Sequence, residues 1–397
     1  MNILVINSGS SSIKFQLIEM PIARVLASGM VERIGIEGGS IQYKSERGTL
    51  KLEEDFEDHN AGLKKIATVL MNPHSGVIDS ADEVEAVGHR VVHGGQKFTE
   101  TIRVNEEVKA NIKELFSLAP LHNPANLTGI EVAEELFPNA EQVCVFDTAF
   151  FSSIPQKAYQ YAIPQKFLDQ DHIRLYGFHG TSHKYVSAKA HEYLNREDLK
   201  LITIHLGNGC SIAALKNGKP IDTSLGFGPA NGLIMGTRAG DIDQSVVFYL
   251  QEKLGYTVEE VNTLLNKESG MLGLTGHSDL RDIEAKAEAG DPVCKLALEM
   301  NAYRIRKYIG AYAAALNGLD AIVFTAGIGE NSSTIRELVC EDMDFLSIKI
   351  DPNENLQRRK GIREIQSAEA RVKVLIIPTN EELEIVNQVY DLVSPTD

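Results

Sequence analysis

A short segment that occurs twice, half a chain apart, places the strongest constraint on this sequence. Residues 3–17 (ILVINSGSSSIKFQL) hold an apolar run, a turn of small polar residues and a second apolar run. Residues 201–215 (LITIHLGNGCSIAAL) repeat the pattern, and a shift of 199 positions aligns Ile3 with Ile202 and Ser12 with Ser211. Apolar runs rich in β-branched residues around a Gly/Ser/Asn turn predict paired strands. Two matching hairpins therefore indicate a duplicated domain.

Both predicted turns carry groups that bind anions. Backbone N–H groups can converge in such a turn, and the Ser hydroxyls and the Asn7 amide add further polar groups. For the first segment alone, an ordinary serine-rich hairpin is an equal alternative. The recurrence favours the functional interpretation, in which each domain offers a phosphate-binding loop toward a shared cleft.

A chain of 397 residues is long for a single hydrophobic core, so two domains are expected. We place the first domain at residues 1–150, joined by a C-terminal helix at 380–397, and the second at residues 151–379. The net charge of −16 argues against nucleic acid or an anionic membrane as partner. It also means that a phosphorylated substrate would need local arginines and a divalent cation.

The four cysteines show no CxxC spacing, which predicts reduced, buried thiols in a cytoplasmic protein. The N-terminus begins directly with a strand and lacks the basic flank of a signal peptide. The sequence has no apolar run long enough to cross a bilayer, so no membrane role is expected.

Two arginines lie beside glycines. Arg90 stands at a strand end in GHRVVHGG (88–95), and Arg238 lies between Gly236 and Gly240. Close backbone approach at such glycines would leave a guanidinium available for an anion. A surface salt bridge is the alternative for Arg90. His122 lies in the loop APLHNPAN, where two prolines restrict the backbone, and a structural role is its alternative.

Asp147 follows a buried strand at 142–146, at the carboxyl end where open α/β sheets bind their ligands. A helix N-cap is the alternative for an Asp followed by Thr148. Further along, His179 and His183 are four residues apart, but Gly180 and Thr181 place His179 in a turn before a helix that Ser182 would cap. A zinc site is therefore not expected there.

The C-terminal third ends in two further signals. A strand at 321–324 enters a Gly-x-Gly turn and a helix capped by Asn331 or Ser332, an arrangement that suits a nucleotide. The pair Thr379 and Glu382 predicts a capping box for a final helix at 380–393. Glu381, in its first turn, is explained equally well by the helix dipole.

Several common catalytic signatures do not occur in the sequence. It has no GxxxxGK[ST] loop, no HExxH and no GxSxG. What remains is two phosphate-type loops, a Gly turn, two arginines and carboxylates at element ends. These are the groups that phosphoryl transfer requires.

The motifs NSGSSSIKF, GHRVVHGG, LHNPAN, FDTAF, YGFHGTSH, HLGNG, MGTRAGD, GIGEN and PTNEE together closely resemble the acetate kinase family, from residue 3 to about 385. The resemblance implies an α/β fold of the actin-like ATPase superfold, with duplicated ribonuclease H-like domains and an interdomain cleft. It also implies a homodimer and a reversible, Mg²⁺-dependent transfer from ATP to acetate, giving acetyl phosphate and ADP. Mn²⁺ is an alternative metal.

The resemblance also assigns roles to individual residues. Arg90 and Arg238 would clamp the acetate carboxylate and the transferring phosphoryl group, and Asp147 would orient the substrate. His179, assisted by His122, would hydrogen-bond the phosphoryl oxygens. Three further sets are implied: Asn7 and Glu381 for Mg²⁺; Val92, Leu121, Phe178 and Pro229 for the methyl group; and Lys14, Ser10, Ser12, His205, Leu206, Gly207, Asn208, Gly209, Asp279, Leu280, Arg281, Gly327, Ile328, Gly329, Glu330 and Asn331 for the nucleotide.

This chain departs from the family pattern in two places. The family usually has GFTPLEG where residues 226–232 are GFGPANG, and the smaller Gly228 and Ala230 would loosen the pocket enough to admit propionate. His277 replaces a small residue near the predicted adenosine contacts. The rival functions are therefore a propionate or butyrate kinase of the same fold, a sugar kinase, and an actin- or chaperone-like ATPase switch. The last would have no use for two phosphoryl-binding arginines.

Overall fold

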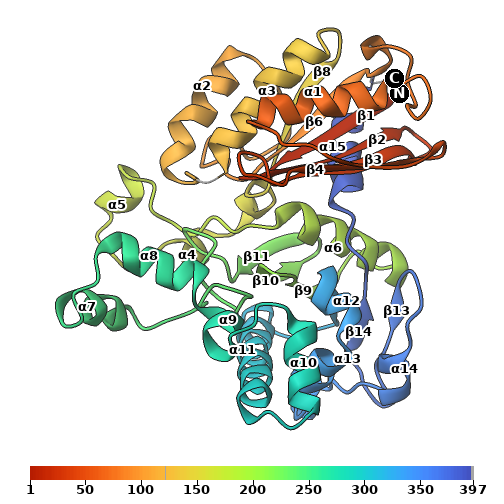
Figure 1. The fold of residues 1–397 in the computed structure, drawn as a ribbon. Coiled ribbons are helices and arrows are strands. Elements are labelled where there is room, and N and C mark those ends of the chain that lie inside the picture. The colour runs from red at the N-terminus through yellow and green to blue at the C-terminus, as the bar shows by residue number, and fades with distance from the viewer. Residues whose placement is uncertain (121, 395–397) are drawn as a thin grey trace. The chain divides into compact units, whose positions relative to one another are not determined.

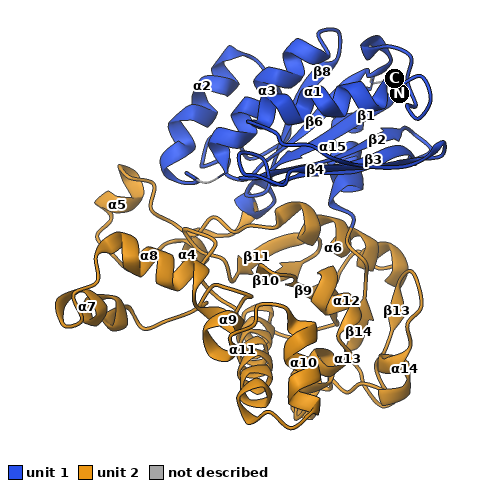
Figure 2. Cartoon of the chain, viewed as in Figure 1, with its two compact units in different colours: residues 1–152, 380–397 blue, residues 153–379 orange. Residues whose placement is uncertain are grey.

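The computed structural model describes residues 1–120 and 122–394, and the chain divides into two units (Figures 1 and 2). Unit 1 comprises residues 1–152 and 380–397, and unit 2 comprises residues 153–379. Leu121, which the resemblance assigns to the methyl pocket, lies outside the described residues.

Unit 1 is built on an eight-stranded sheet of order β5-β4-β3-β2-β1-β6-β8-β7. Strands β1, β6 and β8 run parallel to one another at its centre, and the remaining pairs are antiparallel. The strands are β1 (Asn2–Ser8), β2 (Ser12–Glu19), β3 (Arg24–Glu32), β4 (Ser40–Ser45), β5 (Gly48–Glu53), β6 (Ala86–Val91), β7 (Ile102–Arg103) and β8 (Glu141–Phe146).

Helices cover both faces of this sheet, which explains the continuous apolar run in β1. Because successive side chains alternate between faces, Leu4 and Ile6 join a core with α1 (His59–Leu70) and α3 (Asn123–Leu136). Ile3 and Val5 join a second core with α15 (Glu381–Val393), which the end of the chain supplies. The other helical segments of the unit are η1 (Ala81–Glu83), α2 (Glu106–Glu114), η2 (Leu115–Ser117) and η3 (Ala149–Ser153).

Unit 2 contains a six-stranded sheet of order β11-β10-β9-β12-β14-β13. Its strands are β9 (Lys200–Leu206), β10 (Cys210–Lys216), β11 (Lys219–Thr223), β12 (Ala321–Thr325), β13 (Arg363–Glu364) and β14 (Lys373–Ile376). Its helices are α4 (Gln156–Tyr159), α5 (Lys166–Asp169), α6 (Gly180–Leu194), α7 (Gln244–Glu252), α8 (Val258–Lys267), α9 (Gly270–Thr275), α10 (Leu280–Glu288), α11 (Pro292–Leu316), α12 (Ala326–Asn331), α13 (Ser333–Cys340), η4 (Asp344–Leu346) and α14 (Pro352–Leu356).

The two sheets repeat one topology, so the predicted α/β fold with an internal duplication is confirmed. The order β3-β2-β1-β6-β8-β7 in unit 1 corresponds to β11-β10-β9-β12-β14-β13 in unit 2. In both, an antiparallel hairpin precedes two parallel strands, and a short antiparallel strand follows. The bounds of β9 and β10 match those of β1 and β2 when the chain is shifted by one residue less than in the sequence alignment. Strands buried on both faces lack the alternation that would fix this register.

Three helix starts differ from the sequence predictions, and the predicted cap at Ser332 is confirmed. Ser182 does not cap α6, because the helix already begins at Gly180. The Gly-x-Gly segment is itself helical, as α12, and Ser332 caps the separate helix α13. Asn123 begins α3 instead of lying in the preceding loop. Finally, Asn380 caps α15 through a bond from the Leu383 amide, so the expected capping box at Thr379 does not form. Ser332 and Asn380 satisfy the starts of α13 and α15 through side-chain hydrogen bonds.

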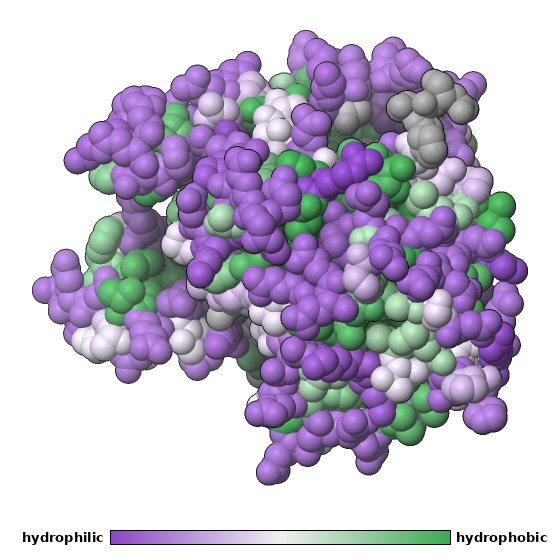
Figure 3. Space-filling view, turned by 90° about the horizontal axis from the view of Figure 1, so that it is seen from above, coloured by the Kyte–Doolittle hydropathy of each residue, from purple (hydrophilic) through white to green (hydrophobic). Residues whose placement is uncertain are grey.

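Within the described part of the chain, no helix combines the length and apolar character needed to span a bilayer. The face drawn in Figure 3 is mostly hydrophilic, with smaller hydrophobic areas between the polar side chains.

Candidate active site

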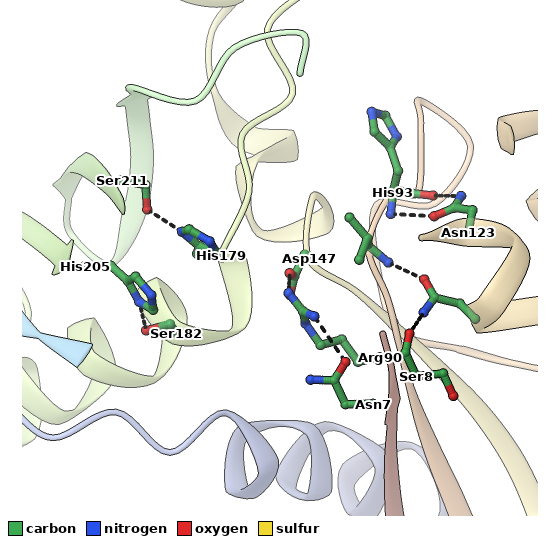
Figure 4. Close-up of polar contacts among 12 residues, drawn as sticks. Asn7, Ser8, Arg90, His93, Asn123, Asp147, His179, Ser182, His205 and Ser211 are labelled. Carbon is green, nitrogen blue, oxygen red and sulfur yellow. Dashed lines mark hydrogen bonds and ion pairs between the residues drawn. The ribbon is translucent and has the colours of Figure 1, made fainter. Parts of the chain in front are cut away.

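In unit 1, three predicted site residues lie at the carboxyl ends of adjacent parallel strands. Asn7 is near the end of β1, Arg90 near the end of β6, and Asp147 directly follows β8. Arg90 forms an ion pair with Asp147 through Nη2, and its Nη1 donates a hydrogen bond to Asn7 Oδ1 at 3.2 Å (Figure 4). The strand pairing thus brings together three groups that are far apart in sequence.

The ion pair is largely shielded from solvent, with side-chain exposures of 18% for Arg90 and 1% for Asp147. Burial opposes the charge on Arg90, but Asp147 and Glu381 outweigh it and raise the pKa of the guanidinium. Arg90 is therefore a permanent cation, held in a charged cluster and not in the surface salt bridge of the alternative interpretation. The carboxylate of Asp147 belongs to this cluster through its ion pair with Arg90.

Glu381 adds a further carboxylate to the cluster from the first turn of α15. Burial raises its pKa, as do the charges of Asp147 and Glu382, while Arg90 and Lys14 act in the opposite direction. Lys14 Nζ lies 2.5 Å from Glu382 Oε1. The cluster therefore holds more carboxylates than its two cations neutralise.

The predicted phosphate loop of unit 1 is a tight turn between β1 and β2. The Gly9 amide donates to the Ser12 carbonyl at 2.7 Å, and His59 Nε2 lies 2.6 Å from the Gly9 carbonyl. The side chain of Ser10 is exposed. The turn therefore keeps a fixed shape and leaves a serine accessible to a ligand.

The loop after β6 is tied to β1 by an asparagine that sequence reasoning missed. Asn126 accepts from the Val92 amide at 3.1 Å and donates to the Ser8 carbonyl at 2.7 Å. His122 occupies the N-cap position of α3, directly before Asn123. Asn126 is part of the motif LHNPAN. It was not singled out because the prolines of this motif already account for a rigid loop.

In unit 2, His179 belongs to a buried hydrogen-bond network. Its Nδ1 lies 2.9 Å from Ser211 Oγ (Figure 4). The same oxygen also lies 2.7 Å from His183 Nε2. His183 Nδ1 in turn lies 2.7 Å from Thr203 Oγ1. The imidazole of His179 also stacks on His205, with ring centroids 4.4 Å apart. Both ring nitrogens of His183 have hydroxyl partners, which gives this histidine a structural place in the network.

Arg238 lies beside the turn of the second hairpin. A Cβ atom on Gly209 would stand 3.3 Å from His179 Nε2 and 3.8 Å from Arg238 Nη1, so this glycine allows both groups to approach. Arg238 donates to the Pro229 carbonyl at 2.7 Å. Among the described residues it forms no ion pair, and burial lowers its pKa. A partly buried cation with no carboxylate partner among the described residues is suited to an anionic ligand.

Several predicted nucleotide residues meet in unit 2. Leu206, Gly207, Leu280 and Ile328 line one small pocket, together with Met235. Asp279 caps α10 and pairs with Arg281 at 2.5 Å on the surface, where this bond lowers the pKa of Asp279 to about 2. The Gly236 amide donates to the Asn208 carbonyl at 3.0 Å. The structure therefore brings together residues of the predicted nucleotide-binding set from the end of β9 and the turn after it, from α10 and from α12.

Comparison with known proteins decides the family. The model of the acetokinase family matches residues 2–387. An acetate kinase of Flavobacterium johnsoniae is 60% identical over 99% of both chains, and acetate kinase 2 of Clostridium perfringens is 52% identical over 99% of this chain and 100% of its own. This chain belongs to the acetokinase family.

Two solved structures are similar along the whole length of this acetokinase. The acetate kinase of Porphyromonas gingivalis has a TM-score of 0.94 and 46% identity, covering 99% of this chain and 100% of its own. A propionate kinase of Francisella tularensis has a TM-score of 0.92 and 40% identity, covering 98% of each. Both similarities extend over the two units.

Oxygen-bearing side chains of unit 1 are of the kind that a magnesium ion binds. Among the described residues, no three His, Cys, Asp or Glu side chains are grouped to hold a metal by themselves. Mg²⁺ usually keeps several waters and binds one or two carboxylates plus substrate phosphates. Asn7 and Glu381 supply such oxygen ligands, and burial, together with the charges of Asp147 and Glu382, raises the pKa of Glu381. The chemistry of this donor set therefore suits the metal.

The predicted methyl-binding residues divide between the units. Val92 is buried in unit 1, while Phe178 is buried and Pro229 half-buried in unit 2. In the segment that departs from the family pattern, a Cβ atom on Gly228 would meet no other atom within 4 Å. The space that a larger residue would fill beside Pro229 is therefore open.

Proposed function

We propose that this chain is an acetate kinase that transfers the γ-phosphoryl group of ATP directly to acetate. A carboxylate oxygen of acetate attacks the γ-phosphorus, the bond from that phosphorus to the bridging β-γ oxygen breaks, and ADP leaves with the electron pair. The products are acetyl phosphate and ADP, and charge balances without a proton. Because a carboxylate is already a nucleophile, alignment and charge stabilisation would account for the rate.

The single observation that best supports this proposal is the environment of Arg238. Its guanidinium is partly buried, adjoins His179 and the Gly209 turn, and has no acidic partner among the described residues. We propose that Arg238 binds the equatorial oxygens of the transferring phosphoryl group. These oxygens gain negative character in the transition state. Arg90, oriented by Asn7 and Asp147, contributes the second guanidinium and binds the acetate carboxylate.

The remaining roles follow from the local contacts. His179 hydrogen-bonds a phosphoryl oxygen, assisted by His122, and Asp147 orients Arg90 and the substrate. Asn7 and Glu381 hold the metal, which when bound neutralises charge on the ATP phosphates. Lys14, Ser10 and Ser12 lie in the same hairpin as Asn7 and contact the phosphates from unit 1.

For the nucleotide, we propose that the second hairpin binds the phosphates through Asn208 and Gly209. The adenosine is bordered by Leu206, Gly207, Leu280 and Ile328, which line the small pocket described above. The other members of this proposed set are His205, Asp279, Arg281, Gly327, Gly329, Glu330 and Asn331. Asn331 Nδ2 donates to the Gly327 carbonyl at 2.8 Å, and this bond stabilises the C-terminal end of α12.

We also propose a cytoplasmic homodimer. Unit 2 exposes large apolar side chains on three helices: Phe248 and Tyr249 on α7, Val258 on α8, and Tyr303 on α11. Exposed apolar surface of this kind is typical of protein–protein contacts. All four cysteines are free and buried, as suits a reducing compartment. Light scattering of the purified protein would give the oligomeric state.

A propionate kinase is the second candidate, and the open space at Gly228 favours it. The structural similarity to the Francisella propionate kinase is consistent with this alternative. One extra methylene changes binding in an apolar pocket by only about 1–3 kcal/mol, so both acids are expected to react.

The test is an assay that traps acyl phosphate as the hydroxamate, run with acetate, propionate and butyrate, each with ATP and with pyrophosphate. We expect the highest kcat/KM with acetate and ATP in the presence of Mg²⁺. A higher value with propionate would establish the second candidate. ATP hydrolysis without any acyl phosphate would contradict both and favour an ATPase switch.

A further inference from the structure

A basic cavity in unit 2 shares Glu330 and Asn331 with the proposed nucleotide set, but its other lining residues have no role in the proposed reaction. It has a volume of about 220 Å³ and lies among α12, α13, α14 and the segment that leads to β13. Five cationic side chains line it, namely Arg336, Arg358, Arg359, Lys360 and Arg363, against one acidic residue, Glu330. This concentration of positive charge is unusual in a chain whose net charge is −16.

Part of this positive charge has a structural function. Arg336 is buried and donates to the carbonyls of Gly329, Glu330 and Asn355, so it satisfies the C-terminal end of α12. Arg363 also donates to the Glu330 carbonyl, at 3.1 Å. Cations at a helix C-terminus are stabilising, and these two guanidiniums are explained in part by that effect.

The rest of the charge exceeds what the fold requires. Within the described residues, Arg358 and Lys360 form no ion pair or hydrogen bond and are exposed, and Arg359 has only a 3.7 Å contact with Glu354. The Nε atom of Arg363 is buried in the cavity wall without a hydrogen-bond partner. A buried donor without an acceptor costs free energy, which a bound acceptor would recover.

Electrostatic repulsion inside the cavity points in the same direction. Burial, followed by the charge of Arg363, lowers the pKa of Arg336 to about 10. Burial, together with the charge of Arg359, also lowers the pKa of Arg363, although Glu330 opposes this. Several cations that disfavour one another would be stabilised by an anion placed between them.

The size and lining of the cavity define the class of ligand. Leu356 is the one apolar residue among those that line it, so an apolar ligand would find little surface to bury. Cavities for drug-sized ligands are usually larger, about 300–1,000 Å³. A compact group with several negative charges matches both the volume and the charge, and arginine favours phosphate through paired N–H donors.

We propose that this cavity binds a small anion carrying two or more phosphoryl groups, at a site separate from the transferred phosphoryl group. The site adjoins α12, whose opposite end carries Gly327 and Ile328 of the proposed nucleotide set. Occupancy of the cavity would stabilise the end of α12 at Glu330 and Asn331. The binding step itself does not depend on the proposed kinase activity.

The test is isothermal titration calorimetry of the full chain with pyrophosphate, without divalent metal, and again with ADP present. The double variant Arg358→Gln/Lys360→Gln removes two exposed cations from the cavity. The control, Lys216→Gln/Lys219→Gln, removes the same charge from the exposed ends of β10 and β11. We expect the cavity variant to weaken one pyrophosphate binding event at least tenfold and the control variant to leave it unchanged.

A second comparison tests the multiple charge. Inorganic phosphate should bind the cavity at least tenfold more weakly than pyrophosphate, and circular dichroism should show both variants folded. Equal pyrophosphate binding by wild type and the cavity variant, or equal weakening by the control, would overturn the proposal. Acyl phosphate formation by the cavity variant is measured separately, so failure of the proposed function would be seen independently of this result.

Discussion

The hydroxyl oxygen of Ser211 lies 2.9 Å from Nδ1 of His179. The same oxygen lies 2.7 Å from Nε2 of His183, whose pKa is lowered well below its usual value by burial and by the charge of His205. His183 is therefore neutral and carries one ring proton. For His179 to present an N–H at Nε2, the donors must run in order from Thr203 through His183 and Ser211 to His179. In that order Ser211 donates to Nδ1 of His179 and accepts from His183, and so holds the proton of His179 on Nε2.

We predict that Ser211→Ala lowers kcat roughly ten- to a hundredfold with little change in KM for acetate, an effect typical of losing an orienting contact behind a functional group. The control is Ser187→Ala, which alters another buried serine, one that bonds only the Lys184 carbonyl within α6. Steady-state kinetics of both variants are the measurement. An unchanged kcat in Ser211→Ala would show that the network is merely structural.

The two proposed phosphoryl-binding arginines should respond differently to truncation. Arg90 neutralises Asp147, which is almost completely buried, whereas Arg238 has no acidic partner among the described residues. We expect each Ala variant to lose at least about 2 kcal/mol of transition-state stabilisation. Only Arg90→Ala should also lose stability, by about 3 kcal/mol, because it removes the cationic partner of a buried carboxylate.

The measurements for this pair are kcat/KM from the hydroxamate assay and urea unfolding of each variant. Arg103→Ala serves as the control, since it removes a half-exposed arginine of the β7 edge that pairs with Glu141. A near-wild-type kcat/KM in either Arg90→Ala or Arg238→Ala would contradict the roles assigned to these arginines.

How far the sequence could predict these features depends on the kind of interaction. The strand-turn-strand repeats and the carboxyl-end position of Asp147 follow from local patterns, and the structure contains them at the expected places. The partner of Arg90 did not follow from local patterns, because Asp147 and Asn7 lie on other strands and meet Arg90 only through the order β1-β6-β8. From the sequence, Ser211 could be identified only as the counterpart of Ser12. Its two histidine partners come from a turn and a helix that are distant from it in sequence.

Helix caps show the same limit at short range. Thr379 and Asn380 both suit an N-cap, and the sequence pattern favoured Thr379 through its spacing to Glu382. In the structure the Thr379 hydroxyl lies 2.9 Å from Ser182 Oγ, in contact with the buried network, and Asn380 takes the cap. A tertiary hydrogen bond thus decided between two residues that local preference ranks almost equally.

Acid should destabilise the protein through a buried histidine outside the proposed site. Burial lowers the pKa of His89 from 6.5 to about 4, although its bond to Gln142, 2.8 Å long, acts in the opposite direction. Because the unfolded chain binds this proton more tightly, the contribution of His89 to stability is complete above pH 6.5 and is lost as the pH falls toward 4. About 2 kcal/mol should be lost between pH 7 and pH 5.

Urea unfolding at both pH values tests this contribution. The variant His89→Gln should lose about 2 kcal/mol less on acidification than wild type. The surface variant His74→Gln should behave as wild type. An identical pH dependence in His89→Gln and wild type would show that His89 is not the titrating group.

Gly88 is needed for the docking of α15, which carries Glu381. A Cβ atom at this position of β6 would lie 2.8 Å from Val389 Cγ2 and 2.9 Å from Ile385 Cγ2. Gly88→Ala should therefore cost about 1–3 kcal/mol of stability by overpacking, and removing methyl groups in Gly88→Ala/Val389→Ala should recover part of it. Gly310→Ala, in α11 where a Cβ meets no atom within 4 Å, should be neutral or stabilising by up to about 1 kcal/mol. Thermal unfolding compares the three variants with wild type.

The choice between acetate and propionate should depend on Gly228. Its added Cβ would meet no atom within 4 Å, so Gly228→Thr is expected to fold normally and to restore the bulk that the family pattern has beside Pro229. If this segment borders the acyl group, the added side chain should lower kcat/KM for propionate relative to acetate by about tenfold, within the 1–3 kcal/mol that one methylene is worth. A second threonine substitution elsewhere in the chain does not provide a clean control. Gly361 has a positive φ of 82°, which threonine would strain. Ser10→Thr would alter a proposed phosphate contact. Ala230→Leu, two residues further on, is the informative companion, since it restores the other family residue. If neither variant changes the propionate-to-acetate ratio, residues 226–232 do not shape the acyl pocket.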